Sequence, residues 1–329
     1  MEAVPQTRAT ALAIGGLAPH RMRRQRLGDT LFRGTTRGFA LGVLLLLGAI
    51  ITALFVGSLP AFRAFGFGFL FNSSWNPVTE NFGALPAIYG TVITSFLAML
   101  LAMPLAFGVA IFLTELCPRA LRRPIGVLIE LLAAIPSIIY GIWGLFILAP
   151  FLQTTLQPAL IASFGRLPLI GALFGGPPLG LGILTASMIL AIMVLPFIAS
   201  VSRDVFQTVP AMLRESAYAM GATTAEVVRD IVIPHSRIGI VGGVMLGLGR
   251  ALGETMAVTF VIGNAHRIKA SLLAPGTTIS ATLANEFTEA VSQLYTSSLI
   301  ALGLILFVIT LIVLAAANYM LWRLSGETT

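Results

Sequence analysis

Two formal charges inside one apolar segment are the residues best placed to do chemistry in this sequence. Arg250 lies about 12 residues into the segment 238–262, and Glu254 follows four residues later. At a helical rise of ~1.5 Å per residue, Arg250 is expected near the midplane of a bilayer, with both side chains on one helix face. A charge at that depth costs about 2.5–3.5 kcal/mol on insertion scales, so it should face a bundle interior or a wet cavity.

Arg250 and Glu254 allow two interpretations. In the first, they form a structural ion pair within closely packed helices, which suits the neighbouring glycines Gly242, Gly243, Gly247, Gly249 and Gly253. An Arg that precedes its Glu by four residues is, however, the less favourable order in a helix. In the second, Arg250 is a cationic point on the path of an anion, because its planar guanidinium makes paired hydrogen bonds to phosphate-like oxyanions. Glu254 would then orient Arg250 and favour a protonated oxyanion.

Long apolar segments must hold these charges. The 329-residue chain is 57% hydrophobic and 10% charged, whereas soluble domains have roughly 25% charged residues. The composition predicts an all-α polytopic membrane protein with six transmembrane helices. The expected spans are about 38–59, 85–113, 125–152, 181–202, 238–262 and 295–322. One cysteine and three histidines leave no internal disulfide and no expected metal site.

The basic residues predict the orientation. With a cytoplasmic N-terminus, 15 Lys or Arg residues lie inside and four lie outside, so both termini are expected in the cytoplasm. The basic tail 1–36, the coupling loop 203–237 and the tail 323–329 are then cytoplasmic, and the permease domain covers 37–322. The Pro- and Gly-rich segment 153–180 is expected to be a membrane-surface or re-entrant loop. Basic residues that flank apolar runs, without a nucleic-acid motif, argue against a nucleic-acid partner.

The cytoplasmic loop carries a fixed pattern. Glu215-Ser216-Ala217 is followed after three residues by Gly221, and after nine more by Ile231-Val232-Ile233-Pro234. We expect two short helices joined at Gly221, which suits a left-handed C-cap. Thr223 or Thr224 can cap the second helix, with Glu226 completing a capping box. Pro234 is expected to end that helix. The simplest alternative is a solvated loop.

This spacing resembles the EAA motif of ABC importer permeases, with Ser216 and Ile233 as departures. The resemblance implies a type I ABC importer permease fold. It also implies coupling to an ATP-binding subunit through Glu215, Ala217, Gly221, Ile231 and Pro234. The chain itself has no Walker-type phosphate loop, so ATP must be bound by a partner. The permease is expected to have no cofactor and no catalytic site.

A second resemblance concerns MLGLGRALGETMAV at 245–258, FNSSWNP at 71–77, LAAIPSIIYGIWG at 132–144 and AMGAT at 219–223. These stretches resemble PstC-type permease subunits of bacterial phosphate ABC importers, from about residue 70 to 322. The resemblance implies an inner-membrane protein with Arg250 and Glu254 on the phosphate path. It implies a PstA-like sister permease, two copies of a PstB-like ATPase and a periplasmic PstS-like binding protein. The alternatives are another oxyanion, such as sulfate or molybdate, or a mainly phosphate-signalling role.

Three further features have open interpretations. Glu130 is expected to snorkel or to pair with Arg122 or Arg123. Trp75, outside the membrane, is expected either to meet a binding protein or to anchor at the interface. His266 and its basic neighbours either attract anions or belong to a solvated loop.

Overall fold

A computed structural model describes residues 19–165, 167 and 171–326. Within these residues the regular secondary structure is helical, apart from one isolated β-bridge between Asn76 and Asn81, and loops connect the helices. The predicted all-α class is confirmed. The N-terminal 18 residues of the predicted tail 1–36, part of the predicted loop 153–180 and the last three residues lie outside the described part.

Two compact units divide the chain, residues 1–53 and residues 54–329. Helix α1, Pro19–Phe65, runs through both. The first unit therefore consists, in its described part, of the beginning of this helix. From Asp29 to residue 53 nearly all its side chains are exposed, including large apolar ones such as Leu41 and Leu44. The predicted tail is thus helical from Pro19.

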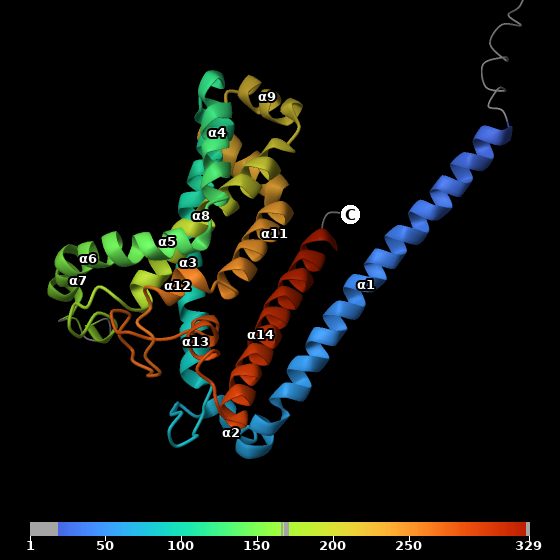
Figure 1. Cartoon of the computed structure of the whole chain (residues 1–329). Coiled ribbons are helices and arrows are strands. Elements are labelled where there is room, and N and C mark those ends of the chain that lie inside the picture. The colour runs from blue at the N-terminus through green and yellow to red at the C-terminus, as the bar shows by residue number, and fades with distance from the viewer. Residues whose placement is uncertain (1–18, 166, 168–170, 327–329) are drawn as a thin grey trace, which may run out of the picture. The chain divides into compact units, whose positions relative to one another are not determined.

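The second unit holds the remaining helices (Figure 1). They are α2 (Gly68–Phe71), α3 (Leu85–Ile111), α4 (Arg119–Ala133), α5 (Ser137–Trp143), α6 (Ala149–Phe151), α7 (Gln157–Phe164), α8 (Ile183–Gln207), α9 (Ala211–Ala219), α10 (Thr224–Val227), α11 (Ile233–Leu252), α12 (Met256–Thr259), α13 (Ile279–Glu286) and α14 (Gln293–Gly326). Six helical stretches in the described part are long and apolar enough to cross a membrane: Asp29–Phe65, Leu85–Leu116, Ser137–Phe164, Ile183–Gln207, Thr224–Leu252 and Gln293–Arg323.

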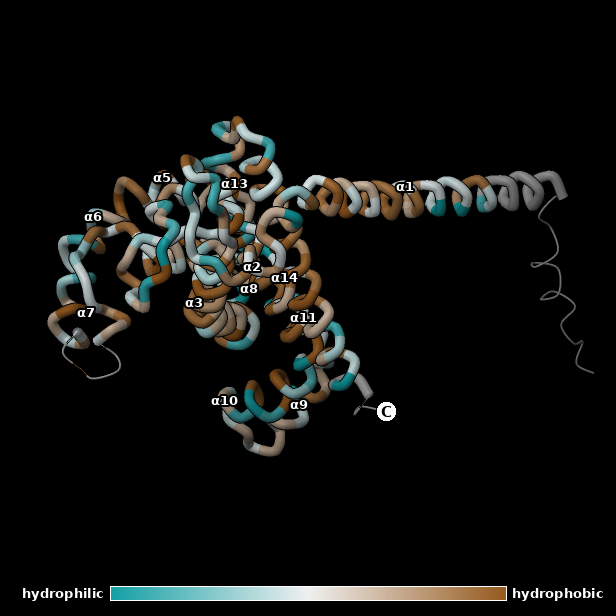
Figure 2. Tube along the Cα trace, turned by 90° about the horizontal axis from the view of Figure 1, so that it is seen from below, coloured by the Kyte–Doolittle hydropathy of each residue, from teal (hydrophilic) through white to brown (hydrophobic). Residues whose placement is uncertain are grey.

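Helices α3 and α8 form the centre of this unit. Alanines at four-residue spacing line one face of α3, at positions 98, 102, 106 and 110, and all four are buried. Small side chains let two helix backbones approach closely. Helices α4 and α11 also pack on α8, and α14 packs on α11. Figure 2 shows that α3 and α14 are mainly hydrophobic, whereas hydrophilic residues gather in α9 and α10.

Glycines also explain how α11 packs on α8. Gly239, Gly243 and Gly247 follow one another at four-residue spacing, and a Cβ built at any of them would lie 2.8 Å or less from a side chain of α8. Those side chains are, in order, Val205, Val201 and Ile198. The glycine-rich segment is therefore a helix-packing surface on this face. Gly242, by contrast, has open space where its Cβ would be.

The segment predicted as one span, 125–152, is not one helix. Helix α4 ends at Ala133, and α5 begins at Ser137 after Pro136, which has no backbone N–H for an intrahelical bond. The Tyr140 hydroxyl donates to the Leu132 carbonyl at 2.9 Å and bridges this break. The helical path then continues to Phe164, so the first part of the predicted loop 153–180 is also helical.

Candidate functional site

The turn at Gly221 has the predicted C-cap geometry. Helix α9 ends at Ala219, and Gly221 has a φ of +91°. The Gly221 N–H donates to the Tyr218 carbonyl at 3.0 Å, and the Ala222 N–H donates to the Ala217 carbonyl at 3.1 Å. These two bonds form a Schellman motif. Glycine is required because a side chain is strained at that φ.

The second helix begins with the predicted capping box. The Thr223 hydroxyl accepts from the Glu226 N–H, and the Glu226 carboxylate accepts from the Thr223 N–H at 2.7 Å. Two otherwise unpaired backbone donors at the helix start are thereby involved in hydrogen bonds. The motif thus forms a compact helix–turn–helix rather than a flexible link.

The prediction that Pro234 ends the second helix is wrong. Helical structure runs without a break from Thr224 to Leu252. A proline inside a helix cannot donate to the preceding turn and clashes with its carbonyl. Here the turn Val228–Val232 is widened to π-helical geometry, and Pro234 falls in the first turn of α11. The second half of the coupling motif, from Thr224, and the fifth span are therefore one continuous helix.

The motif residues face two ways. Ala217 is buried in a cluster with Phe206 and Val227, against which Ile231 packs. Glu215 is exposed and makes no ion pair within the described part of the chain. Large apolar side chains lie on the same exposed surface: Met212 is 75% exposed and Met220 is 84% exposed. The inner residues hold α9 on the permease, and the outer ones are free to meet another protein.

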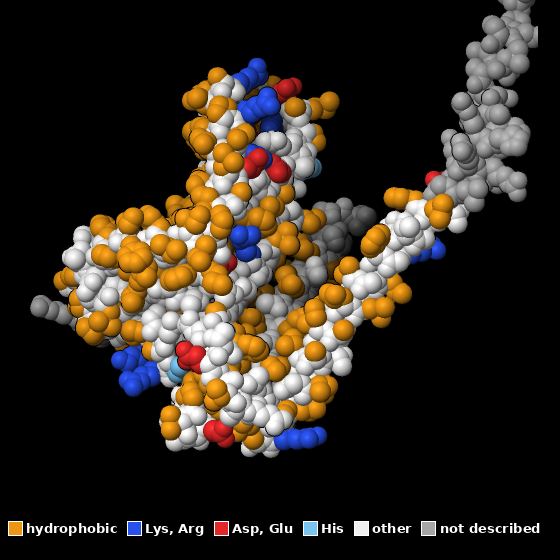
Figure 3. Space-filling model, viewed as in Figure 1, with side chains coloured by type: hydrophobic (Ala, Val, Ile, Leu, Met, Phe, Trp, Pro, Cys, Tyr) orange, Lys and Arg blue, Asp and Glu red, His pale blue; other side chains and the backbone are white. Residues whose placement is uncertain are grey.

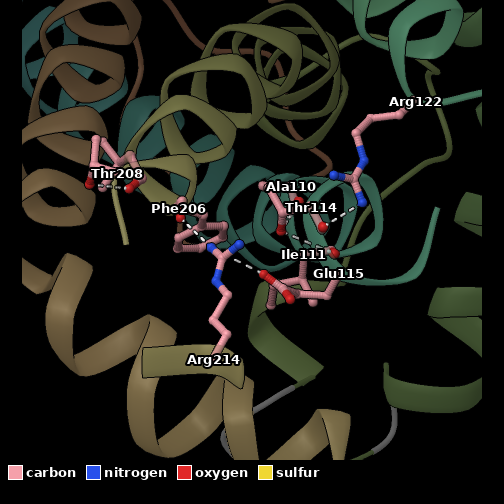
Figure 4. A network of polar contacts seen from close by, with 9 residues as sticks. Ala110, Ile111, Thr114, Glu115, Arg122, Phe206, Thr208 and Arg214 are labelled. Atoms are coloured by element: carbon pink, nitrogen blue, oxygen red, sulfur yellow. Dashed lines mark hydrogen bonds and ion pairs between the residues drawn. The ribbon is translucent and has the colours of Figure 1, made fainter. Parts of the chain in front are cut away.

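An ion pair anchors α9 to the end of α3. Arg214 Nη2 lies 3.3 Å from Glu115 Oε1, and Arg214 also donates to the Phe206 carbonyl at 2.5 Å (Figure 4). Glu115 is only 6% exposed. Its Oε1 has no aligned hydrogen bond, so the contact is an ion pair. A neighbouring bond, from Arg122 to the Thr114 carbonyl at 2.7 Å, joins α4 to the same turn.

Arg250 and Glu254 do not share a helix face. Helix α11 ends at Leu252, and Gly253 is its C-cap. Glu254 therefore lies in the break before α12, where its carboxylate accepts from the Ala257 N–H at 3.2 Å. Across the described residues no ion pair joins the two charges. The same-face expectation is corrected because the helix stops between them.

Arg250 is exposed in this chain. Its positive charge acts electrostatically on the Tyr140 side chain. Tyr140 also lines an apolar pocket of about 240 Å³ together with Trp143 and Ile192. The Arg250 guanidinium, with an apolar wall nearby, can offer several donors to an oxyanion, whereas the Tyr140 hydroxyl already donates to the Leu132 carbonyl.

Glu286, at the end of α13, organises the end of the unit away from α4 and α9 (Figure 1). Its carboxylate accepts from Trp75 Nε1 at 2.6 Å and from the Tyr295 hydroxyl at 2.7 Å, and it pairs with His266 Nε2 at 2.6 Å. Burial would raise the pKa of Glu286, but these hydrogen bonds outweigh burial and lower it. The Trp75 ring also stacks on His266. Trp75 is therefore tied to α13 through Glu286 and to the loop that carries His266.

Comparison with known proteins assigns the family. The sequence profile described as "Binding-protein-dependent transport system inner membrane component" matches residues 102–325. The chain belongs to this family. It is accordingly a multi-pass inner-membrane component of an ABC importer, a transport system that works with a binding protein.

Relatives of this inner membrane component are similar along almost their whole length. A protein of Mesorhizobium japonicum named "Phosphate transport system permease protein PstC" is 64% identical, and the match covers 99% of this chain and 98% of the relative. A protein of the same name from Pasteurella multocida is 57% identical, with 91% and 93% covered.

Solved structures show the fold of the permease. The MetNI methionine ABC transporter in an inward-facing conformation matches with a TM-score of 0.55 at 16% identity, covering 72% of this chain and 94% of that one. A bacterial alginate ABC transporter, bound to its periplasmic protein, matches with a TM-score of 0.54 at 21% identity, covering 89% and 97%. The ABC importer permease fold is thus confirmed.

Sequence reasoning missed Arg214 and Glu115 in this permease. Each had a weak signal: Glu115 is the first acid after a long apolar segment, and Arg214 directly precedes the motif residue Glu215. No helical spacing relates them, so only the packing of α9 against the end of α3 brings them together. Among the described residues no cluster of His, Cys, Asp or Glu could hold a metal ion.

Proposed function

We propose that this chain is the permease subunit of an ATP-driven importer of inorganic phosphate. The observation that carries the proposal is the 64% identity to a phosphate permease along almost the full length of both chains. The permease itself has no catalytic site and no cofactor, and ATP is hydrolysed by a partner. Both termini are cytoplasmic, because 15 of the 20 basic residues then lie inside.

Three partners follow from this role. A PstA-like sister permease completes the path, two PstB-like subunits hydrolyse ATP, and a PstS-like protein delivers phosphate from the periplasm. The α9–α10 turn supplies the surface for the ATPase, because its exposed methionines and Glu215 lie beside a rigid backbone. The end organised by Glu286 is the surface for the binding protein, since the orientation places it outside.

Arg250 supplies the cationic point on the phosphate path. Supporting observations are its exposure in the single chain and the absence of an ion pair to Glu254 within the described part. Glu254 acts as a cap that holds the break between α11 and α12 in place. An unpaired charge in a span is costly unless it meets water or a partner. A transported oxyanion meets that requirement.

Uptake of radiolabelled phosphate by the reconstituted complex tests this function. We expect Arg250→Leu to lower the uptake rate at least tenfold, roughly the loss of one charged hydrogen bond, while the complex still assembles. Arg237→Leu removes a charge from the same helix and is the matched control, with uptake kept. Unchanged uptake in Arg250→Leu would refute the path assignment.

Competition separates the alternatives. Sulfate and molybdate should fail to displace phosphate, and stronger inhibition by either would assign the permease to that oxyanion. Normal phosphate signalling in an uptake-dead complex would favour the regulatory role. For coupling, Met220→Ser should weaken co-purification of the ATPase. Val291→Ser, which changes a 97% exposed side chain at the other end, should not.

A further inference from the structure

A pocket between α4 and α8 is lined mainly by arginine. It measures about 400 Å³, and its lining includes neither Arg250 nor a residue of the coupling turn. Figure 3 shows that basic side chains gather at the end of the unit that carries α4 and α9. The family assignment and the proposed path give these arginines no role.

Four guanidiniums line this arginine pocket. Arg119, Arg122 and Arg123 come from the first turn and a half of α4, at spacings that place them on one helix face. Arg203 comes from α8 and crosses α4 at Gly126, where a Cβ would lie 2.8 Å from its Nη1. Glycine at 126 therefore gives Arg203 room to lie across the pocket floor.

The pocket has more positive charge than its acids neutralise. Arg203 is paired, because its Nη2 lies 2.8 Å from Glu130 Oε1 and 2.8 Å from Asp204 Oδ1. Glu130 thus pairs with Arg203 and not, as predicted, with Arg122 or Arg123. Within the described residues none of the three arginines of α4 has an acidic partner. Like charges that line one pocket repel one another, so an anion between them is favoured.

Arg122 adds a buried donor without an acceptor. Its Nη2 donates to the Thr114 carbonyl, but its Nε is buried and has no hydrogen-bond partner in the described part of the chain. A buried unsatisfied donor, particularly a charged one, is unfavourable. Arg122 is thus held beside the pocket with one donor unsatisfied, while the exposed guanidiniums of Arg119 and Arg123 are free to bind phosphate oxygens with paired bonds.

We propose that the arginine pocket binds a phosphate group. Two sources share this chemistry: the headgroup of an anionic phospholipid and inorganic phosphate in the cytoplasm. The neighbouring face of α4 exposes Leu121, Leu128 and Leu131, against which acyl chains can pack. On the proposed orientation the pocket lies at the cytoplasmic headgroup layer, where basic pockets between helices bind anionic lipid.

Native mass spectrometry of the purified importer complex tests the pocket. The probes are phosphatidylglycerol and cardiolipin, with phosphatidylcholine as the uncharged comparison, and inorganic phosphate in a separate titration. We expect wild type to retain anionic lipid, and Arg119→Gln/Arg123→Gln to retain at least about tenfold less, from a contribution of a few-fold per basic side chain. Arg37→Gln/Arg323→Gln removes the same charge elsewhere and should retain lipid as wild type does.

A third variant should change anion retention in the opposite direction. Glu130→Gln removes the carboxylate that neutralises Arg203 and should tighten anion retention several-fold. A purely structural role for the cluster predicts no tightening. Displacement of lipid by millimolar phosphate would identify free phosphate as the ligand. Equal retention of lipid and phosphate by wild type and Arg119→Gln/Arg123→Gln would overturn the proposal, whatever the uptake assay reports.

Discussion

Replacing Arg214 with methionine should loosen α9 from the permease. The substitution removes the ion pair to Glu115 and the hydrogen bond to the Phe206 carbonyl. It leaves a carboxylate that is 6% exposed without its partner. Breaking a buried pair in this way costs about 3–5 kcal/mol.

The expected cost is smaller here because Arg214 is 20% exposed, so water already reaches one side of the pair. We expect about 2–3 kcal/mol, which shifts the docking equilibrium of α9 by roughly 30- to 150-fold. Glu115→Gln/Arg214→Met removes the buried charge together with its partner. It should regain much of this free energy, because an uncharged amide is far cheaper to bury.

Amide hydrogen exchange in the purified complex measures this shift directly. Amides of residues 211–222 should exchange about 30- to 150-fold faster in Arg214→Met, because exchange follows local opening. The double variant should lie closer to wild type. Exchange in Arg214→Met within about threefold of wild type, which corresponds to less than ~1 kcal/mol, would refute the anchoring argument. A double variant as loose as the single one would refute the role of the buried charge.

Three other changes have defined outcomes. Gly221→Ala should lower the free energy of unfolding by about 1–2 kcal/mol, because Gly221 has a positive φ. Gly242→Ala, which also has open space for its Cβ, should instead stabilise its helix, and thermal unfolding measures both changes. Thr223→Ala should cost about 1 kcal/mol through loss of the cap, seen as faster exchange in the second helix. Burial raises the pKa of Glu286, but its hydrogen bonds outweigh burial and hold the pKa below the ordinary 4.5. The ionised Glu286 therefore stabilises the fold fully above pH 4.5, and this stabilisation is lost as the pH falls through the lower pKa of the folded state. Trp75 fluorescence should report this acid transition, and Glu286→Gln should remove it.

Local features of the coupling loop could be predicted from the sequence. A glycine C-cap and a capping box depend on residues within four positions of one another, so Gly221, Thr223 and Glu226 were enough to predict the turn. The number of apolar helices followed equally from composition and length, although the third of them is Ser137–Phe164 and not the predicted 125–152. The predicted helix end at Pro234 was wrong because a π-helical turn accommodates the proline. No sequence rule indicates where such a turn forms.

Tertiary features were beyond the sequence. Glu130 pairs with Arg203, 73 positions away, in preference to the nearby arginines of its own helix. The partner was decided by the crossing of α4 and α8 at Gly126. The charges at 250 and 254 have helical spacing, yet Gly253 ends the helix between them. A four-residue spacing places two side chains on one face only if the helix continues through both residues, and α11 ends before Glu254.

The continuous helix from Thr224 to Leu252 gives the coupling turn a direct connection to Arg250. Its contact with α8 uses glycines at four-residue spacing, over which Val205, Val201 and Ile198 of α8 lie. We infer that α11 moves against α8 by small sliding displacements, which are the usual way in which packed helices shift. The exchange experiment on Arg214→Met tests the rigidity that this requires. Faster exchange should be confined to α9 and its turn, while residues 233–252 keep their protection; loosening of both would mean that α11 cannot carry a displacement from the turn to the membrane charge.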